Sequence, residues 1–154
     1  MTARGPIVWD GIELMSFIVS ARGDLDRERF RKLKVWGKSH ALALNTIAVA
    51  KKVRGSDNSP LRLQMIRAAA SIPTNIVERT GQESAKEFGR FLSIAIKSSS
   101  ELEYHLVLAR DLELISRSEF TSLTDQTIEV RRMLYVLRTR VVTSAKTAKR
   151  AVPT

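Results

Sequence analysis

Few residues in this chain could carry out chemistry, and their spacing argues against an active site. His40 and His105 are its only histidines, and it contains no cysteine. A histidine can act as a general base or bind a metal, and metal-binding helical bundles use Glu-x-x-His pairs that face inward. The sequence has no Glu-x-x-His. We therefore expect no catalytic residue, no metal and no cofactor, and we expect His105 to be a hydrogen-bonded histidine of the core.

Acidic residues offer a second route to catalysis, because paired carboxylates can act as acid and base. Four of them form two pairs with a spacing of two residues: Glu101, Glu103, Asp111 and Glu113. Residues two apart on a helix point about 200° from each other, so such a pair cannot share a substrate. A solvated face, or salt bridges to Lys97 and Arg110, explains them better. With no phosphate loop or nucleotide fingerprint either, we expect a protein that is not an enzyme.

Basic residues are the most informative class, because they can bind phosphate. The net charge is +10, from 26 Lys and Arg against 16 Asp and Glu. Residues 39–130 hold eleven charges of each sign, residues 1–38 hold eight basic and five acidic residues, and residues 131–154 hold seven basic residues and no acid. The surplus at the two ends predicts binding of a polyanion, although a charge that serves only solubility would give the same composition.

The predicted nucleic-acid-binding residues lie at these two ends. They are Arg31, Lys32, Lys34, Lys38, Arg131, Arg132, Arg138, Arg140, Lys146, Lys149 and Arg150. Aromatic stacking partners are scarce nearby, with Tyr135 the only candidate that we expect to be exposed, so we expect recognition of shape and charge in structured RNA or DNA. The alternative is a protein-interaction adaptor whose basic tail docks an acidic partner.

Two long helices are predicted in the second half of the chain, over residues 84–115 and from residue 116 to about 142. In each, apolar residues recur at alternating steps of three and four, which places them on one helix face. Each opens with a capping box of the form S-x-x-E, first at Ser84 and then at Ser116. Seams of this length need partner helices along them.

Two more helices are predicted before them, over residues 34–54 and 60–78. Gly55 can stop the first in a left-handed conformation, and Ser59 can cap the second. Pro73 lies inside the second helix, where it either kinks that helix or separates two shorter ones. In an antiparallel bundle the first helix starts at the end where the fourth finishes, so the two basic patches could merge.

Four helices with short connections predict an all-α fold, an antiparallel up-down four-helix bundle with an irregular N-terminal extension. We assign the extension to residues 1–29, with disorder as one interpretation, the bundle to residues 30–142, and a basic tail that can fray to residues 143–154. The longest apolar run, over residues 12–19, is shorter than the roughly 20 residues of a membrane-spanning helix, and we expect a cytoplasmic protein.

The end of the third predicted helix is apolar on nearly all sides, which predicts contact with another subunit. The predicted interface residues are Tyr104, Val107, Leu108, Leu114 and Ile115. The alternative is a locally thick core beneath the turn that follows.

Five segments resemble a known family in the right order: residues 30–36 (FRKLKVW), 67–76 (RAAASIPTNI), 87–92 (EFGRFL), 101–104 (ELEY) and 108–112 (LARDL). The chain resembles, over about residues 30–142, the four-helix-bundle proteins encoded in intervening sequences of bacterial 23S ribosomal RNA genes, which are related to accessory proteins of diversity-generating retroelements.

This resemblance implies a small bundle that assembles into a ring, typically a pentamer, with a basic surface that contacts nucleic acid and with no chemistry. The retroelement relatives add a reverse transcriptase as a candidate acidic partner for the adaptor alternative. The chain departs from the family pattern at Gly81, where the glycine after the second helix comes late, and at Lys97, where glycine is usual. The second departure places the subunit packing near Lys97 in question.

Overall fold

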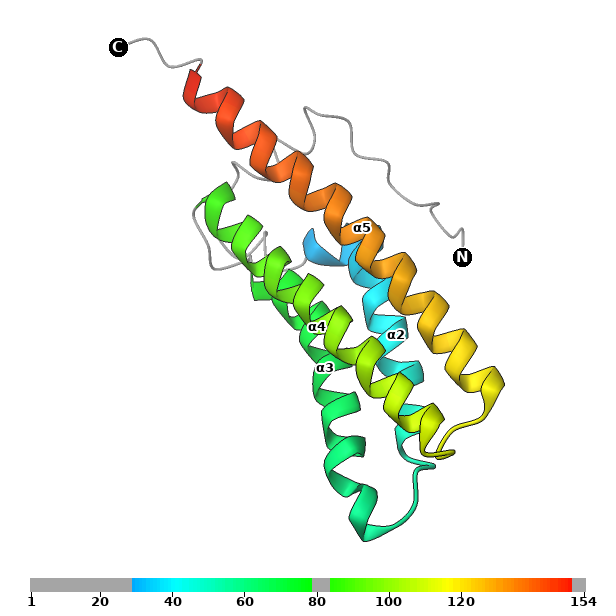
Figure 1. The fold of residues 1–154 in the computed structure, drawn as a ribbon. Coiled ribbons are helices and arrows are strands. Elements are labelled where there is room, and N and C mark those ends of the chain that lie inside the picture. Colours follow the sequence, from blue (N-terminus) through cyan, green and yellow to red (C-terminus); the bar gives the residue numbers. More distant parts are fainter. Residues whose placement is uncertain (1–28, 79–83, 151–154) are drawn as a thin grey trace.

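The computed structural model describes residues 29–78 and 84–150, which form four long α-helices and two short 3-10 helices (Figure 1). The elements are η2 (Arg29–Lys32), α2 (Lys34–Ala50), η3 (Ser56–Asn58), α3 (Ser59–Val77), α4 (Ala85–Asp111) and α5 (Arg117–Arg150). The predicted all-α four-helix bundle is therefore confirmed. The extension over residues 1–28, the break at Gly81 and residues 151–154 lie outside the described residues.

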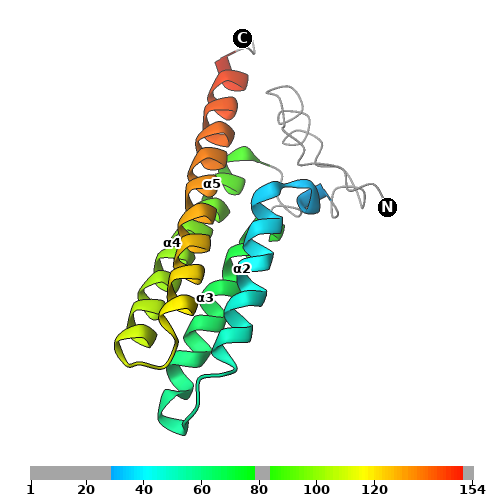
Figure 2. The ribbon, with the colours of Figure 1, turned by 90° about the vertical axis from the view of Figure 1, so that its right-hand side faces the viewer.

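The four helices run alternately up and down. α4 packs against α3 and α5, α2 packs against α3, and the contact between α2 and α5 is the least extensive. α5 runs past the other helices at the end where α2 begins (Figures 1 and 2). It continues to Arg150, so residues 143–150 of the predicted tail are helical. No helix in the described part of the chain has the length and apolarity to cross a membrane.

The apolar seams of the two long helices form the centre of the core. In α5, the predicted seam residues Leu123, Thr127, Val130, Leu134 and Val141 are buried. The buried hydroxyl of Thr127 donates to the carbonyl of Leu123 at 2.7 Å, so it leaves no unpaired polar group there. The periodicity read from the sequence thus corresponds to the face that α5 turns towards α4.

Both predicted capping boxes are present. The Ser84 hydroxyl accepts a hydrogen bond from the Glu87 N–H at 3.2 Å at the start of α4. At the start of α5 the exchange is reciprocal: Ser116 Oγ accepts from the Glu119 N–H at 3.0 Å, and Glu119 Oε2 accepts from the Ser116 N–H at 2.9 Å. These bonds satisfy N–H groups that a helix start leaves without partners.

α4 ends four residues earlier than predicted, at Asp111. Glu113 adopts a positive φ of 57°, and the N–H groups of Glu113 and Leu114 donate to the carbonyls of Arg110 and Ala109 at 2.9 and 2.8 Å. This is the hydrogen-bond pattern of a Schellman motif, which usually carries glycine at the left-handed position. Because glutamate stands there, the sequence gives no signal for this helix end.

The first two helices also differ in detail from the prediction. α2 ends at Ala50, and Gly55, with φ 95°, precedes η3 instead of stopping α2. Asn58, not Ser59, occupies the N-cap position of α3. α3 runs through the buried Pro73 without a break, so the interpretation as two separate helices is wrong.

Candidate nucleic-acid interface

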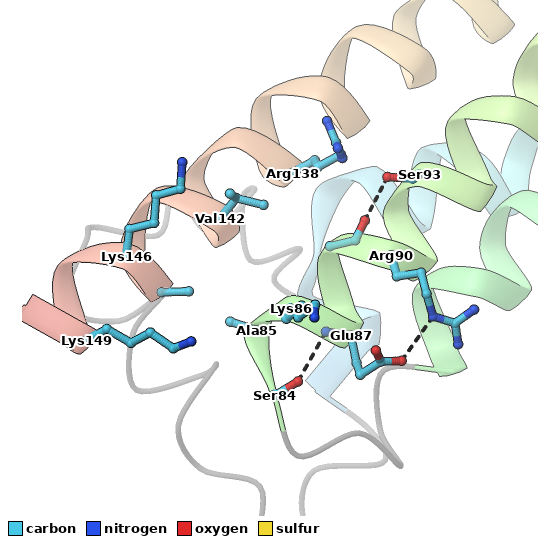
Figure 3. Close-up of a pocket in the computed structure, with 12 residues that line it drawn as sticks. Ser84, Ala85, Lys86, Glu87, Arg90, Ser93, Arg138, Val142, Lys146 and Lys149 are labelled. Carbon is cyan, nitrogen blue, oxygen red and sulfur yellow. Dashed lines mark hydrogen bonds and ion pairs between the residues drawn. The ribbon is translucent and has the colours of Figure 1, made fainter.

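An open groove of about 620 Å³ lies between the start of α4 and the last turns of α5 (Figure 3). Its lining includes the small or apolar residues Ala85, Gly89, Val142 and Ala145, which we call the floor. A Cβ atom on Gly89 would lie 3.3 Å from Cγ2 of Val142, so the glycine allows the two helices to approach closely there. Beyond that contact the open groove lies between α4 and α5.

Five cationic side chains line the groove, and we call it the cationic groove. Lys86 and Arg90 come from α4, and Arg138, Lys146 and Lys149 come from α5 (Figure 3). Among the described residues, Glu87 is the one acidic residue that lines it, and its carboxylate forms an ion pair with Arg90 at 3.0 Å. The groove also lies at the N-terminal end of α4, where the helix dipole is positive. The cations of α4, the cations of α5 and the dipole of α4 therefore all make the electrostatic potential of the groove positive.

The structure brings together three of the cations predicted from the sequence. Arg138, Lys146 and Lys149 are exposed in the groove. Lys86 and Arg90 were missed, because they lie in the stretch of the sequence whose charges sum to zero. The available signal was their spacing of four at the start of a helix, which places both on one face.

The four predicted cations at the start of the first helix are exposed, at the same end of the bundle as the groove, but they do not line it. They are Arg31, Lys32, Lys34 and Lys38. Lys38 forms an ion pair with Glu129 of α5 at 3.0 Å, and the Arg31 guanidinium lies 5.9 Å from the centre of the Phe30 ring. This patch therefore shares the end of the bundle with the groove as a separate surface.

The remaining predicted cations of α5 divide into one paired and three exposed side chains. Arg131 is half-buried and forms an ion pair with Glu103 at 2.5 Å, which ties α5 to α4. Arg132, Arg140 and Arg150 are exposed and lie outside the groove lining. Arg131 therefore has a structural partner, and it is the least available of the predicted contacts.

The predicted interface residues differ in exposure. Ile115 is buried and Leu114 packs partly buried against the core, so the local-core alternative accounts for these two. Tyr104 is 60% exposed, Leu112 is 59% exposed, and Leu108 is half-buried. Leu112 is not among the predicted interface residues and is the C-cap residue of α4. Spaced by four, Tyr104, Leu108 and Leu112 form one stripe at the C-terminal end of α4, which we call the Tyr104 stripe. Val107, the fifth predicted residue, is half-buried.

The two histidines lie on different helices. His40 is exposed and its ring stacks on Trp36, with the ring centres 5.0 Å apart. His105 is half-buried, and its Nδ1 atom has no hydrogen-bond partner, so the prediction of a hydrogen-bonded histidine is wrong for this atom. Within residues 29–78 and 84–150, no group of three or more His, Asp or Glu side chains is placed to hold a metal ion.

The acidic residues considered as catalytic pairs are placed as follows. Asp111 forms the expected kind of ion pair with Arg110, at 2.8 Å. Glu103 pairs with Arg131 instead of Lys97 or Arg110. Glu101 and Glu113 are exposed. The structure therefore places none of these carboxylates opposite another across a cleft.

Comparison with known proteins agrees with the fold. The sequence model of the family described as 23S rRNA-intervening sequence protein matches residues 31–136. A crystal structure of a protein of unknown function from the S23 ribosomal protein family of Bacteroides thetaiotaomicron is 27% identical, with a TM-score of 0.63, and the similarity covers 68% of this chain and 95% of that chain. No curated protein matches this chain. The family match ends at Val136, so the α5 side of the cationic groove lies beyond it.

Proposed function

This chain belongs to the 23S rRNA-intervening sequence protein family, as its resemblance predicted, and from that premise we propose that it binds structured RNA or DNA through the cationic groove and the exposed cations of α5. The observation that carries the proposal is the convergence of five cations from two helices on one groove, where the one carboxylate among the described lining residues is already paired. Lys86, Arg138, Lys146 and Lys149 have no ion-pair partner within the described residues. They are therefore available for phosphates.

The recognition that this surface supports is of backbone and shape. No aromatic side chain in the described part of the chain lines the groove, and Tyr135, which is 52% exposed, lies elsewhere on α5. Lysine and arginine contacts to phosphates give affinity and position, whereas sequence is read from base edges or by stacking. Binding should therefore depend strongly on salt and little on base sequence.

The proposal includes a role by binding alone, without catalysis. Its support is that acidic side chains in the bundle hold structure: Glu87, Glu103, Glu119 and Glu129 each form an ion pair with a cation of this chain. Carboxylates held in this way stabilise helix starts and helix contacts. This structural use of the carboxylates supports a role by binding.

We also propose that the protein is a homo-oligomer, which the family resemblance implies to be a ring and typically a pentamer. The Tyr104 stripe is the surface that supports a subunit contact, because it exposes large apolar side chains along one helix face. Several copies in a ring would bring several cationic grooves to one nucleic acid and add to the field that attracts it.

The test is binding of a fluorescently labelled RNA hairpin and a DNA duplex, followed by anisotropy over a range of salt concentrations. In R138E/K146E, we expect weaker binding, and a salt slope reduced by about 2, since each phosphate contact contributes about 0.9. The control K51E/R54E makes the same change of charge at two exposed cations outside the groove and outside the Tyr104 stripe, and should change binding much less.

Equal losses in the two variants would overturn the proposed location. No detectable binding of either nucleic acid by the unmodified chain at low salt would overturn the function. That result would leave the adaptor alternative, in which the same cations meet an acidic protein.

A further inference from the structure

The cationic groove has a mixed character that a phosphate chain does not match in full. Its rims are cationic, but Ala85, Val142 and Ala145 in its lining are apolar. Phosphates can neutralise the rims and leave the floor exposed to water. An occupant that matches both the cationic rims and the apolar floor has apolar side chains at its centre and acidic residues on both sides.

The chain itself contains a segment with this composition. Residues 14–19 are LMSFIV, with five apolar side chains out of six. Acidic residues flank this run on both sides, with Asp10 and Glu13 before it and Asp24, Asp26 and Glu28 after it. Residues 10–28 hold these five acids against two arginines, so this segment is negative in a chain whose net charge is +10.

We propose that residues 10–28 dock in the cationic groove of the same molecule. In this arrangement the run over residues 14–19 covers the apolar floor. The acidic flanks then pair with the cations at the rims, Lys86 on one side and Lys146 and Lys149 on the other, which have no ion-pair partner within the described residues. Burial of the apolar floor and the ion pairs at the rims would both stabilise the docked segment.

The connection is long enough. The segment ends directly before η2, at the end of the bundle where the groove lies (Figure 2). Nine residues lie between Val19 and Arg29, and the ten Cα–Cα steps of an extended chain span about 33 Å. Neighbouring helix axes are about 10 Å apart, so the path from α2 around the bundle to the groove crosses about 20 Å.

The two proposed partners also share a place relative to the family. The family match covers residues 31–136. Residues 10–28 precede it, and the α5 contribution to the groove, from Arg138 to Lys149, follows it. The segment and the α5 side of the groove both lie outside the family match, and they have opposite charge and shared apolar character, so they fit as one feature of this chain.

The absence of cysteine permits a direct test with the full-length chain. In S16C/S93C, one thiol lies in the apolar run and the other lines the groove. The control S16C/S122C places the second thiol near the start of α5, at the opposite end of the bundle, where Ser122 is more exposed than Ser93. In dilute protein with oxidised glutathione, we expect the groove pair to form an intrachain disulfide at least about tenfold faster, because docking raises the local thiol concentration. Non-reducing gels and peptide mapping measure the rate and the linkage.

Charge reversal tests the role of the rim. Addition of K146E/K149E to S16C/S93C should reduce the rate towards that of the control pair, whereas addition of K51E/R54E, at exposed cations outside the groove, should leave it unchanged. The proposal would be overturned by equal rates of disulfide formation for the two cysteine pairs, or by a rate for S16C/S93C that K146E/K149E leaves unchanged. A disulfide between two molecules would also overturn it and assign the groove to a second copy. Because the assay contains no nucleic acid, its failure is distinct from a failure of the proposed function.

Discussion

Glu119 is a single residue that fixes a helix start and joins two parts of the bundle. Its carboxylate accepts from the Ser116 N–H at 2.9 Å and from Lys52 Nζ, beyond the end of α2, also at 2.9 Å. The hydrogen bond from the Ser116 backbone, followed by that from Lys52, lowers the pKa of Glu119 below its usual 4.5, although burial opposes the shift. A carboxylate held this way favours the folded state only while it is ionised.

The pH dependence follows from the direction of this shift. Because the pKa of Glu119 is lower in the folded state, its stabilisation is complete above about pH 4.5 and is lost as the pH falls through the lowered value. We expect E119Q to reduce the free energy of unfolding by about 0.3–1 kcal/mol at pH 7, because the amide oxygen can still accept from the Ser116 N–H and only the charge is lost. The deficit should shrink at pH 3. Urea unfolding at both pH values measures it, with D125N on the same helix as control, and an equal deficit at both values would contradict the assignment.

Glu113 gives a second prediction at this scale, because it holds a positive φ of 57° at the end of α4. A left-handed conformation costs a residue with a Cβ about 1–2 kcal/mol, whereas glycine adopts it freely. We expect E113G to raise the free energy of unfolding by about 0.5–1 kcal/mol. Glycine removes the cost of the left-handed conformation, but its higher conformational entropy in the unfolded chain offsets part of this stabilisation. In the control E101G, at an exposed position inside α4, the change should be a loss of about 1 kcal/mol. Destabilisation by E113G in urea unfolding would contradict the assignment.

Among the elements, α5 shows most clearly how a repeating pattern becomes packing. Leu134 lies in the predicted seam and is fully buried, whereas its neighbour Tyr135 is 52% exposed. We expect L134A to cost about 2–5 kcal/mol of folding free energy through lost burial and a cavity, and Y135A to cost much less. Denaturant unfolding of the two variants measures the difference. Similar losses would mean that the face of α5 has been assigned incorrectly.

The sequence predicts the elements better than the groove, for a physical reason. The seams and the boxes at Ser84 and Ser116 are local patterns, and local geometry is enough to form them. The groove depends on which turn of α4 meets which turn of α5. That register places Gly89 against Val142 and Lys86 beside the end of α5, and no local pattern encodes it. A count of charges along the sequence therefore found the cations of α5 and missed those of α4.

In the whole molecule, ion pairs neutralise the middle of the bundle and leave one end positive. The pairs Lys38–Glu129 and Arg131–Glu103 tie α5 to α2 and to α4. Beyond them α5 carries cations without an acid to its end at Arg150. Exposed charges of one sign at one end can act on a polyanion at a distance of about one Debye length, roughly 8–10 Å in physiological salt. The proposed nucleic-acid contact and the proposed docking of residues 10–28 both depend on this layout.

Assembly is the remaining property at this scale, and the Tyr104 stripe makes it testable. A homo-oligomer that buries the stripe should give a mass several times 17.3 kDa in light scattering. L112E would place a carboxylate without a partner in the buried contact, at a cost of several kcal/mol, so we expect it to lower the mass towards that of one chain.

The matched control is L44E, because Leu44 of α2 is 54% exposed, close to the 59% of Leu112, and lies outside the stripe. Lys97, where the family resemblance implies a glycine, stands seven residues before Tyr104 and therefore shares its face of α4. Its long side chain can extend past the edge of a contact while its ammonium stays in water, so we expect the oligomer to form despite it. An unmodified chain that scatters as 17.3 kDa would contradict the proposed assembly. Equal effects of L112E and L44E would contradict its assignment to the stripe.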